Sequence, residues 1–311
     1  MVRSSEATGA PLRQPASATT VSIVLFVLGL SCASLQSGFS KLLVSELSPL
    51  FVVWGRFAGF LVIVLVIVMW RHGRVGLRPP QPVLQGVRAL LLVAASVAFI
   101  AAIRSMPLAD AIAIVFVYPF IVTASAPLVL GERVPLSSWI AVATGFVGVL
   151  VVVRPGFGDT DWHALLALAA GTCFGAHLLV TRQLRTSAPP LVTATSTAFI
   201  GTLVLSVALP FVWQPLAMNQ VFLMVLVGVF GAASQLLAII ACGKAEMSVL
   251  APFGYTEIIS ATLVGFVMFG DFPDWVAWAG IAVIVASGIC IAYGQRRTRV
   301  PLISRTRPPA S

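Results

Sequence analysis

The stretch from Met247 to Asp274, MSVLAPFGYTEIISATLVGFVMFGDFPD, decides the fold because it is apolar enough to cross a bilayer. It also carries a carboxylate, Glu257, near its middle, directly after Tyr255 and Thr256. A charged side chain at the centre of a membrane helix costs about 2.5 to 3.5 kcal/mol on insertion scales, so Glu257 is expected to face protein or water. The rest of the chain is therefore predicted to supply helices that surround this one.

The composition of the whole chain indicates an all-α polytopic membrane protein. The chain has 311 residues, is 59% hydrophobic and 9% charged, and has a mean hydropathy of +1.03. Soluble domains carry about 25% charged residues, so this chain lies outside their range. The net charge of +9 does not indicate nucleic-acid binding, because the basic residues are divided among short loops and a C-terminal tail.

Ten windows of about 20 apolar residues are long enough to cross the membrane. Residues 1–20 are predicted to form a disordered cytoplasmic tail, and residues 295–311 a basic cytoplasmic tail. The predicted spans are 21–44, 50–70, 84–103, 109–130, 136–153, 162–182, 190–213, 221–241, 247–269 and 275–294.

The distribution of Lys and Arg predicts that both termini are cytoplasmic. Placing both termini on one side gives that side fifteen of the nineteen basic residues, Arg88 among them. The opposite side receives Lys41, Arg104 and Arg154, and Arg56 lies inside a helix. Because positively charged loops stay in the cytoplasm, we expect a multi-pass protein of the inner (plasma) membrane.

Comparing the sequence with itself indicates two repeats. The repeats are residues 21–153 and 162–294, with five predicted spans each, and an odd number of spans inverts the second copy relative to the first. Inverted repeats that meet around a site near the bilayer midplane are typical of secondary transporters. At shifts of 141 or 139 residues the matched pairs are Cys32 with Cys173, Gln36 with His177, Lys41 with Arg182, Tyr118 with Glu257, and Gly131-Glu132 with Gly270-Asp271.

Five short motifs occur in the chain in a specific order: Arg56-Phe57, Gly131 to Arg133, APFGYTE (Ala251 to Glu257), FGDFPD (Phe269 to Asp274) and GIAVIVASG (Gly280 to Gly288). Through these motifs the sequence resembles the EamA-type branch of the drug/metabolite transporter superfamily over nearly all of residues 21–294. This resemblance implies a ten-helix secondary carrier of small organic solutes, with its cavity between the two halves. The phrase MPLADAIAI, Met106 to Ile114, is similar to a branch that includes riboflavin and S-adenosylmethionine importers. The chain departs from many relatives at Ile258, where they carry proline.

Two charged residues inside predicted spans are the first candidates for a substrate or coupling site. Glu257 can serve as a proton-coupling group or as a counter-charge for a cationic substrate group, or it can pair with Arg56 to fix helix packing. Arg56 can bind a substrate carboxylate or phosphate through its planar guanidinium group, or it can lock the second and ninth spans together.

Five more side chains complete the expected lining of a central cavity. His177 and Gln36 occupy repeat-equivalent positions in spans six and one, so pseudo-symmetry places both near the central axis. A lone histidine in a membrane helix is, however, most often a packing residue. Gln235, Tyr118 and Tyr255 add amide and hydroxyl groups, and tyrosines suit a pocket that holds an apolar ring.

Arg104 and Asp110 flank the turn into the fourth span, where they are either a gate pair or plain solvated charges. We predict no catalytic residues, no cofactor and no enzymatic activity. The chain lacks the phosphate-binding pattern Gly-x-x-x-x-Gly-Lys of ATP-driven pumps, and its three histidines lie on separate segments without metal-ligand spacing, which does not favour a metal site.

The predicted function is secondary active transport of a small organic metabolite by alternating access. The first interpretation is efflux of an amino-acid-like compound or a drug or metabolite, with proton coupling as a candidate energy source. One alternative is import of a vitamin or cofactor such as riboflavin or S-adenosylmethionine. An alternative of another class is a non-transporting membrane scaffold or sensor with the same fold. The expected partners are a small-molecule substrate and the lipid bilayer, with a homodimer left open.

Overall fold

The computed structural model describes residues 16–72, 80–130, 135–153, 162–184, 189–244 and 247–298. All regular structure in these residues is helical. Eight helical stretches of at least 18 residues are apolar enough to cross a membrane, and the shorter apolar helices Leu136–Val152 and Trp275–Ile291 complete ten spans. The predicted ten-span fold is therefore confirmed. The Gly131 to Arg133 motif and the tail residues 1–15 and 299–311 lie outside the described part of the chain.

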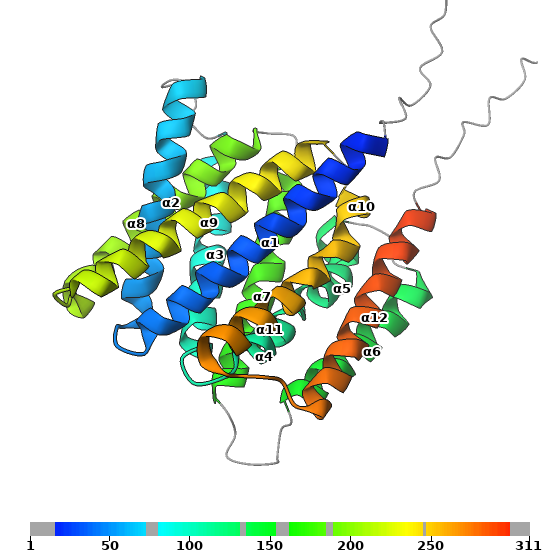
Figure 1. Cartoon of the computed structure of the whole chain (residues 1–311). Helices are drawn as coiled ribbons and strands as arrows, with labels where there is room; N and C mark the ends of the chain where they lie inside the picture. The colour runs from blue at the N-terminus through cyan, green and yellow to red at the C-terminus, as the bar shows by residue number, and fades with distance from the viewer. Residues whose placement is uncertain are drawn as a thin grey trace, which may run out of the picture.

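The two halves contain the same series of helices (Figure 1). The first half contains α1 (Ala16–Val44), α2 (Pro49–His72), α3 (Pro82–Ala102), α4 (Leu108–Val115), α5 (Tyr118–Leu130) and α6 (Leu136–Val153). The second half contains α7 (Trp162–Gln183), α8 (Pro190–Val212), α9 (Met218–Lys244), α10 (Met247–Leu250), the 3-10 helix η2 (Ala251–Tyr255), α11 (Thr256–Phe269) and α12 (Trp275–Thr298).

The first and last helices are longer than predicted. Helix α1 begins at Ala16 and α12 ends at Thr298, so residues 16–20 and 295–298 are helical and do not belong to the tails. No proline or glycine occurs within either added segment, whereas Pro15 precedes the first and Pro301 follows the second. Because neither residue type is present to interrupt them, the added segments can continue the helices.

The fourth span of each half is interrupted, which the sequence analysis did not predict. In the first half α4 ends at Val115 and α5 begins at Tyr118, and in the second half η2 separates α10 from α11. Pro119 and Pro252 lie at these interruptions and lack the N–H group that a continuous helix requires. The two breaks occupy nearly the same position in the two repeats, as the match of Tyr118 with Glu257 indicates.

The second half is inverted relative to the first. Helix α1 begins and α12 ends at the same end of the bundle, which we call the termini side, and the opposite end is the far side (Figure 1). Helix α1 runs from the termini side to the far side, whereas its repeat counterpart α7 runs the other way. The halves interlock, because α1 packs against α9, α2 against α8 and α9, and α3 against α7 and α8.

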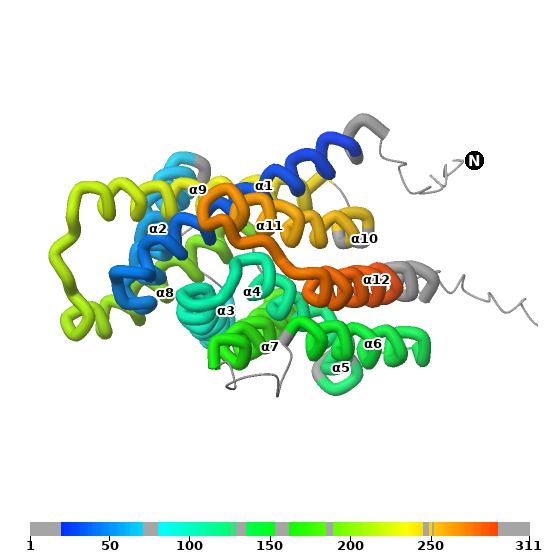
Figure 2. Tube along the Cα trace, turned by 60° about the horizontal axis from the view of Figure 1, so that its bottom comes forward, coloured from blue at the N-terminus to red at the C-terminus, as the bar shows by residue number. Residues whose placement is uncertain are grey.

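The surface of the bundle fits a bilayer. Helices α6 and α12 pack against each other beside the interlocked helices (Figure 2). The six tryptophans at span ends are all exposed, as expected for side chains at a membrane–water interface; they are Trp70, Trp139, Trp162, Trp213, Trp275 and Trp278. The largest apolar core gathers residues such as Leu43, Phe51, Ile103 and Leu108, which lie toward the far side.

Candidate functional site

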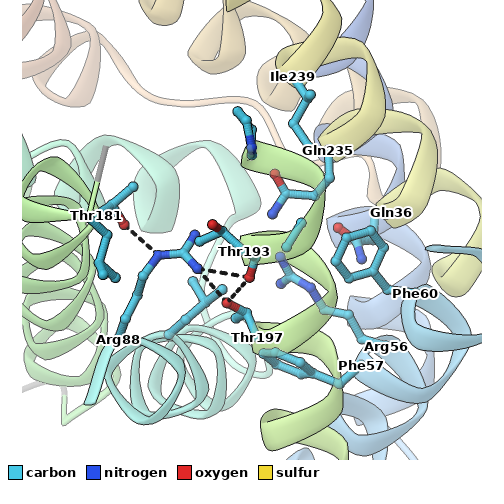
Figure 3. A pocket seen from close by; sticks show the side chains of 15 residues that line it. Gln36, Arg56, Phe57, Phe60, Arg88, Thr181, Thr193, Thr197, Gln235 and Ile239 are labelled. Atoms are coloured by element: carbon cyan, nitrogen blue, oxygen red, sulfur yellow. Dashed lines mark hydrogen bonds between the residues drawn. The ribbon is translucent and has the colours of Figure 1, made fainter. Parts of the chain in front are cut away.

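A cavity of about 260 Å³ lies between the two halves. Its walls come from three helices of each half, α1 to α3 and α7 to α9 (Figure 3). This volume lies just below the usual range of small-molecule sites, about 300 to 1,000 Å³. Aromatic and aliphatic side chains, including Phe57 and Phe60, share the walls with polar ones. The polar lining residues are Gln36, Arg56, Arg88, Thr181, Thr193, Thr197 and Gln235.

The cavity extends from the middle of the bundle toward the termini side. Thr181 and Leu184 lie at the end of α7, Thr193 near the start of α8, and Ile239 near the end of α9. All of these helix ends lie on the termini side, since α7 and α9 run toward it and α8 starts there. A solute in the cavity is therefore closer to the termini side than to the far side.

Arg88 is the most strongly held polar side chain of the cavity. Its Nε donates to Thr181 Oγ1 at 2.7 Å, and its Nη1 donates to the backbone oxygen of Thr193 at 3.1 Å and to Thr197 Oγ1 at 2.5 Å. These bonds join α3 of the first half to α7 and α8 of the second (Figure 3). The sequence analysis counted Arg88 among the surface charges of the termini side, and the structure corrects this by placing it inside α3 on the cavity wall. Its position within the predicted span 84–103 was compatible with a place on the cavity wall but did not distinguish that place from the surface.

Arg56 enters the cavity from the opposite wall, on α2 (Figure 3). Within the described chain its guanidinium group makes no hydrogen bond and no direct ion pair, although it interacts electrostatically with Glu257. Because α11 packs mainly against α1 and α4, an interlock between α2 and α11 is not the main contact of either helix. Arg56 is thus placed to contact a solute in the cavity.

Gln36 and His177 belong to the site in different ways. Gln36 lines the cavity from α1 and donates from Nε2 to the backbone oxygen of Val227 at 3.2 Å, and a Cβ atom at Gly231 would overlap its amide group. His177 is buried with an exposed fraction of 5%, and its Nδ1 lies 2.9 Å from the backbone oxygen of Arg88. His177 therefore supports the Arg88 segment and does not line the cavity.

Tyr118, Tyr255 and Glu257 lie at the interruptions of the fourth spans, outside the cavity lining. The rings of Tyr118 and Tyr255 lie 5.4 and 5.1 Å from the ring of Phe116. Glu257 is half-buried in the first turn of α11, and Ser34 Oγ donates to its backbone oxygen at 3.4 Å. Its charge interacts with Arg56 and Tyr118, which indicates a carboxylate directed into the bundle.

On the far side an ion pair joins the two halves. Lys41 Nζ at the end of α1 lies 2.7 Å from Asp271 Oδ2 in the loop between α11 and α12. It also donates to the backbone oxygen of Met106 at 3.1 Å, and it lies 4.6 Å from the ring centroid of Phe269. Sequence reasoning did not connect Lys41 with Asp271, because 230 residues separate them.

The predicted gate residues lie on the same face. Arg104 is exposed on the turn before α4, and Asp110 is half-buried in the first turn of α4. Their gate role stays a prediction. Gln235, the remaining predicted site residue, is exposed toward the cavity from α9. Of the seven predicted substrate or coupling residues, the structure thus brings Arg56, Gln36 and Gln235 together on the cavity wall.

Comparison with known proteins places the chain in a transporter family. The model of the EamA-like transporter family matches residues 20–154 and 161–293, which are the two halves of the fold. A riboflavin transporter of Rhizobium johnstonii is 29% identical over 238 residues, covering 74% of this chain and 77% of that protein. An S-adenosylmethionine uptake transporter of Rickettsia prowazekii is 23% identical over 277 residues, covering 89% of this chain and 94% of that protein. One crystal structure shares the fold, with a TM-score of 0.63, 17% identity, and coverage of 91% of this chain and 99% of the other.

Proposed function

Because the chain belongs to the EamA-like transporter family, we propose that it is a secondary transporter that imports a small organic metabolite, of the vitamin or cofactor kind, by alternating access. The single observation that carries this proposal is the cavity between inverted halves, which extends to the termini side while Lys41 and Asp271 join the halves on the far side. Such an arrangement is expected of one end state of an alternating-access carrier.

The packing of the interrupted spans supports the same proposal. On the far side α4 packs against α11, whereas in the described residues α5 packs against α6 and α7 and not along α10 or η2. By repeat equivalence, α5 corresponds to α11 and the α10–η2 segment corresponds to α4. The fold therefore forms the interhalf contact on one side and leaves its counterpart unformed on the other, as alternation between two states requires.

The proposal also includes the direction of transport, which is import, and its energy source, which is a proton gradient. A relative named for S-adenosylmethionine uptake supports import, and no comparison favours the efflux interpretation of the sequence over it. We place the termini in the cytoplasm from the distribution of basic residues, so that the cavity faces the cytoplasm in this state. We assign proton coupling to Glu257, because its carboxylate is directed into the bundle near Arg56 and Tyr118.

The test is uptake by purified protein in proteoliposomes, with and without an imposed pH gradient. Riboflavin and S-adenosylmethionine are the first substrates of a metabolite panel, and protein-free liposomes are the control. The proposal expects saturable accumulation of at least one panel member that the pH gradient increases. A protein that binds panel members but neither accumulates nor exchanges any of them would support the scaffold or sensor interpretation instead.

A further inference from the structure

Two arginines reach into the cavity from opposite walls, and the described walls contain no acidic side chain to balance them. Arg56 comes from α2 and Arg88 from α3, and in the view of Figure 3 Thr193 and Thr197 of α8 appear between the two guanidinium groups. The other polar groups on the walls are neutral amides and hydroxyls. Glu257 interacts with Arg56 from outside the lining, and Arg88 has no acidic neighbour of this kind.

The hydrogen-bond donors of both arginines are only partly used. Nε and Nη1 of Arg88 donate hydrogen bonds to Thr181, Thr193 and Thr197, and these bonds fix the orientation of the guanidinium group. Its Nη2 donates no hydrogen bond to any described residue. Arg56 donates no hydrogen bond to the described chain. The arginine nitrogens without a hydrogen bond are accessible to solvent, because the fully buried, unpaired side-chain atoms of the described chain include no arginine nitrogen.

A cation inside a membrane protein requires a compensating anion or water, because leaving it alone in a low-dielectric site is costly. The planar guanidinium group matches the geometry of carboxylate and phosphate oxygens, and two such groups around one space favour an anionic ligand over a neutral one. Phe57 and Phe60 beside Arg56 offer an apolar surface for the remainder of such a molecule.

We propose that Arg56 and Arg88 together bind an oxoanion, a carboxylate or a phosphate, so that the transported metabolite is an organic acid or a phosphate ester. This inference rests on the proposed transport function and names the substrate class of the same cavity. Arg88 is the fixed anchor, held by three residues of the second half, whereas Arg56 makes no hydrogen bond in the described chain. Both arginines belong to the first half, and the threonines that hold Arg88 connect this anion site to the second half.

The first test measures the melting temperature of the purified protein with inorganic phosphate or malonate, against chloride at equal ionic strength. An anion at about ten times its Kd is expected to raise Tm by roughly 2 to 4 °C. The rise should be absent in Arg56→Gln and Arg88→Gln and present in Lys244→Gln, which removes an exposed charge at the end of α9. A response to phosphate alone or to malonate alone identifies the preferred group. No response in the wild type, or an equal response in the arginine variants, would overturn the proposal.

The Tm of the variants without added anion distinguishes anion binding from a purely structural role of the arginines. Arg56 donates no hydrogen bond in the described chain, so Arg56→Gln should leave Tm unchanged or raise it, whereas loss of a packing contact would lower it. If Arg88→Gln fails to fold, Arg88→Lys keeps the charge and Thr197→Val removes one support of Nη1. Both are expected to weaken the phosphate or malonate response, and an undiminished response in both would overturn the role of Arg88.

The second test separates this inference from the transport proposal. Proteoliposome uptake is compared within two pairs that differ by one acidic group: flavin mononucleotide with riboflavin, and S-adenosylmethionine with its decarboxylated form. The acidic member of at least one pair should be preferred by at least about tenfold, and Arg56→Gln should remove the preference. Equal uptake within both pairs would overturn the oxoanion site and leave the transport function standing. Stabilisation by phosphate or malonate without uptake of any solute would support the oxoanion site and overturn the transport function.

Discussion

The Lys41–Asp271 ion pair gives the most direct test of the proposed far-side closure. The two side chains are 12% and 34% exposed, so the pair is neither fully buried nor freely solvated. Exposed pairs contribute about 0.2 to 1 kcal/mol, and breaking a buried pair costs about 3 to 5 kcal/mol. With the added bond to Met106, we expect the pair to stabilise the closed far side by about 1 to 2 kcal/mol.

A loss of about 1.4 kcal/mol changes an equilibrium about tenfold, so Asp271→Asn should increase the population open to the far side by that factor. The assay is the labelling rate of a cysteine introduced at Gln235 in a protein without its four native cysteines. A membrane-impermeant maleimide is added from the far side. Labelling should become about tenfold faster in Asp271→Asn and in Lys41→Gln.

Two further variants make the reasoning refutable. The double variant Lys41→Gln/Asp271→Asn should label no faster than either single variant, because each substitution removes the same contact. The exchange Lys41→Asp/Asp271→Lys should restore part of the slow wild-type rate. Unchanged labelling in the single variants, or rate increases that multiply in the double variant, would show that this ion pair does not hold the far side closed.

Three other predictions concern coupling and packing. Glu257→Gln should abolish the stimulation of uptake by a pH gradient and retain solute exchange in counterflow; a wild-type pH profile would contradict a coupling role. Gly59→Ala should destabilise the fold by about 1 to 3 kcal/mol in thermal unfolding, because a Cβ there would lie 2.8 Å from Gly228 Cα, whereas Gly86→Ala, with no atom within 4 Å, should not. Gly270→Ala should cost about 1 kcal/mol at the end of α11, where φ is +73°, and a neutral effect on Tm would refute the strain argument.

The membrane spans were predictable because a run of about 20 apolar residues identifies each span without reference to the rest of the chain. The ten predicted segments coincide with the observed ones to within a few residues, apart from the longer ends of α1 and α12. The interruptions were missed although Pro119 and Pro252 were visible, because proline is tolerated in membrane helices and its effect depends on the neighbouring helices.

The cavity residues were predictable only where a polar side chain lies deep in a span. Arg56, Gln36 and Gln235 met that condition and line the cavity. Arg88 lies close enough to the start of α3 that its long side chain could equally have reached the interface, so position along the helix did not decide between surface and cavity. Packing against α7 and α8 decides it, and sequence periodicity does not carry that information.

The paired interruptions of the fourth spans have a mechanical consequence. Each break divides its span into two short helices, and under the proposed alternating access these half-spans can tilt separately, in opposite senses in the two inverted repeats. Swapping the conformations of the two repeats would lay α10 and η2 along α5 and release α4 from α11. Under the proposed mechanism, the shape of each repeat is therefore a template for its twin in the alternative state.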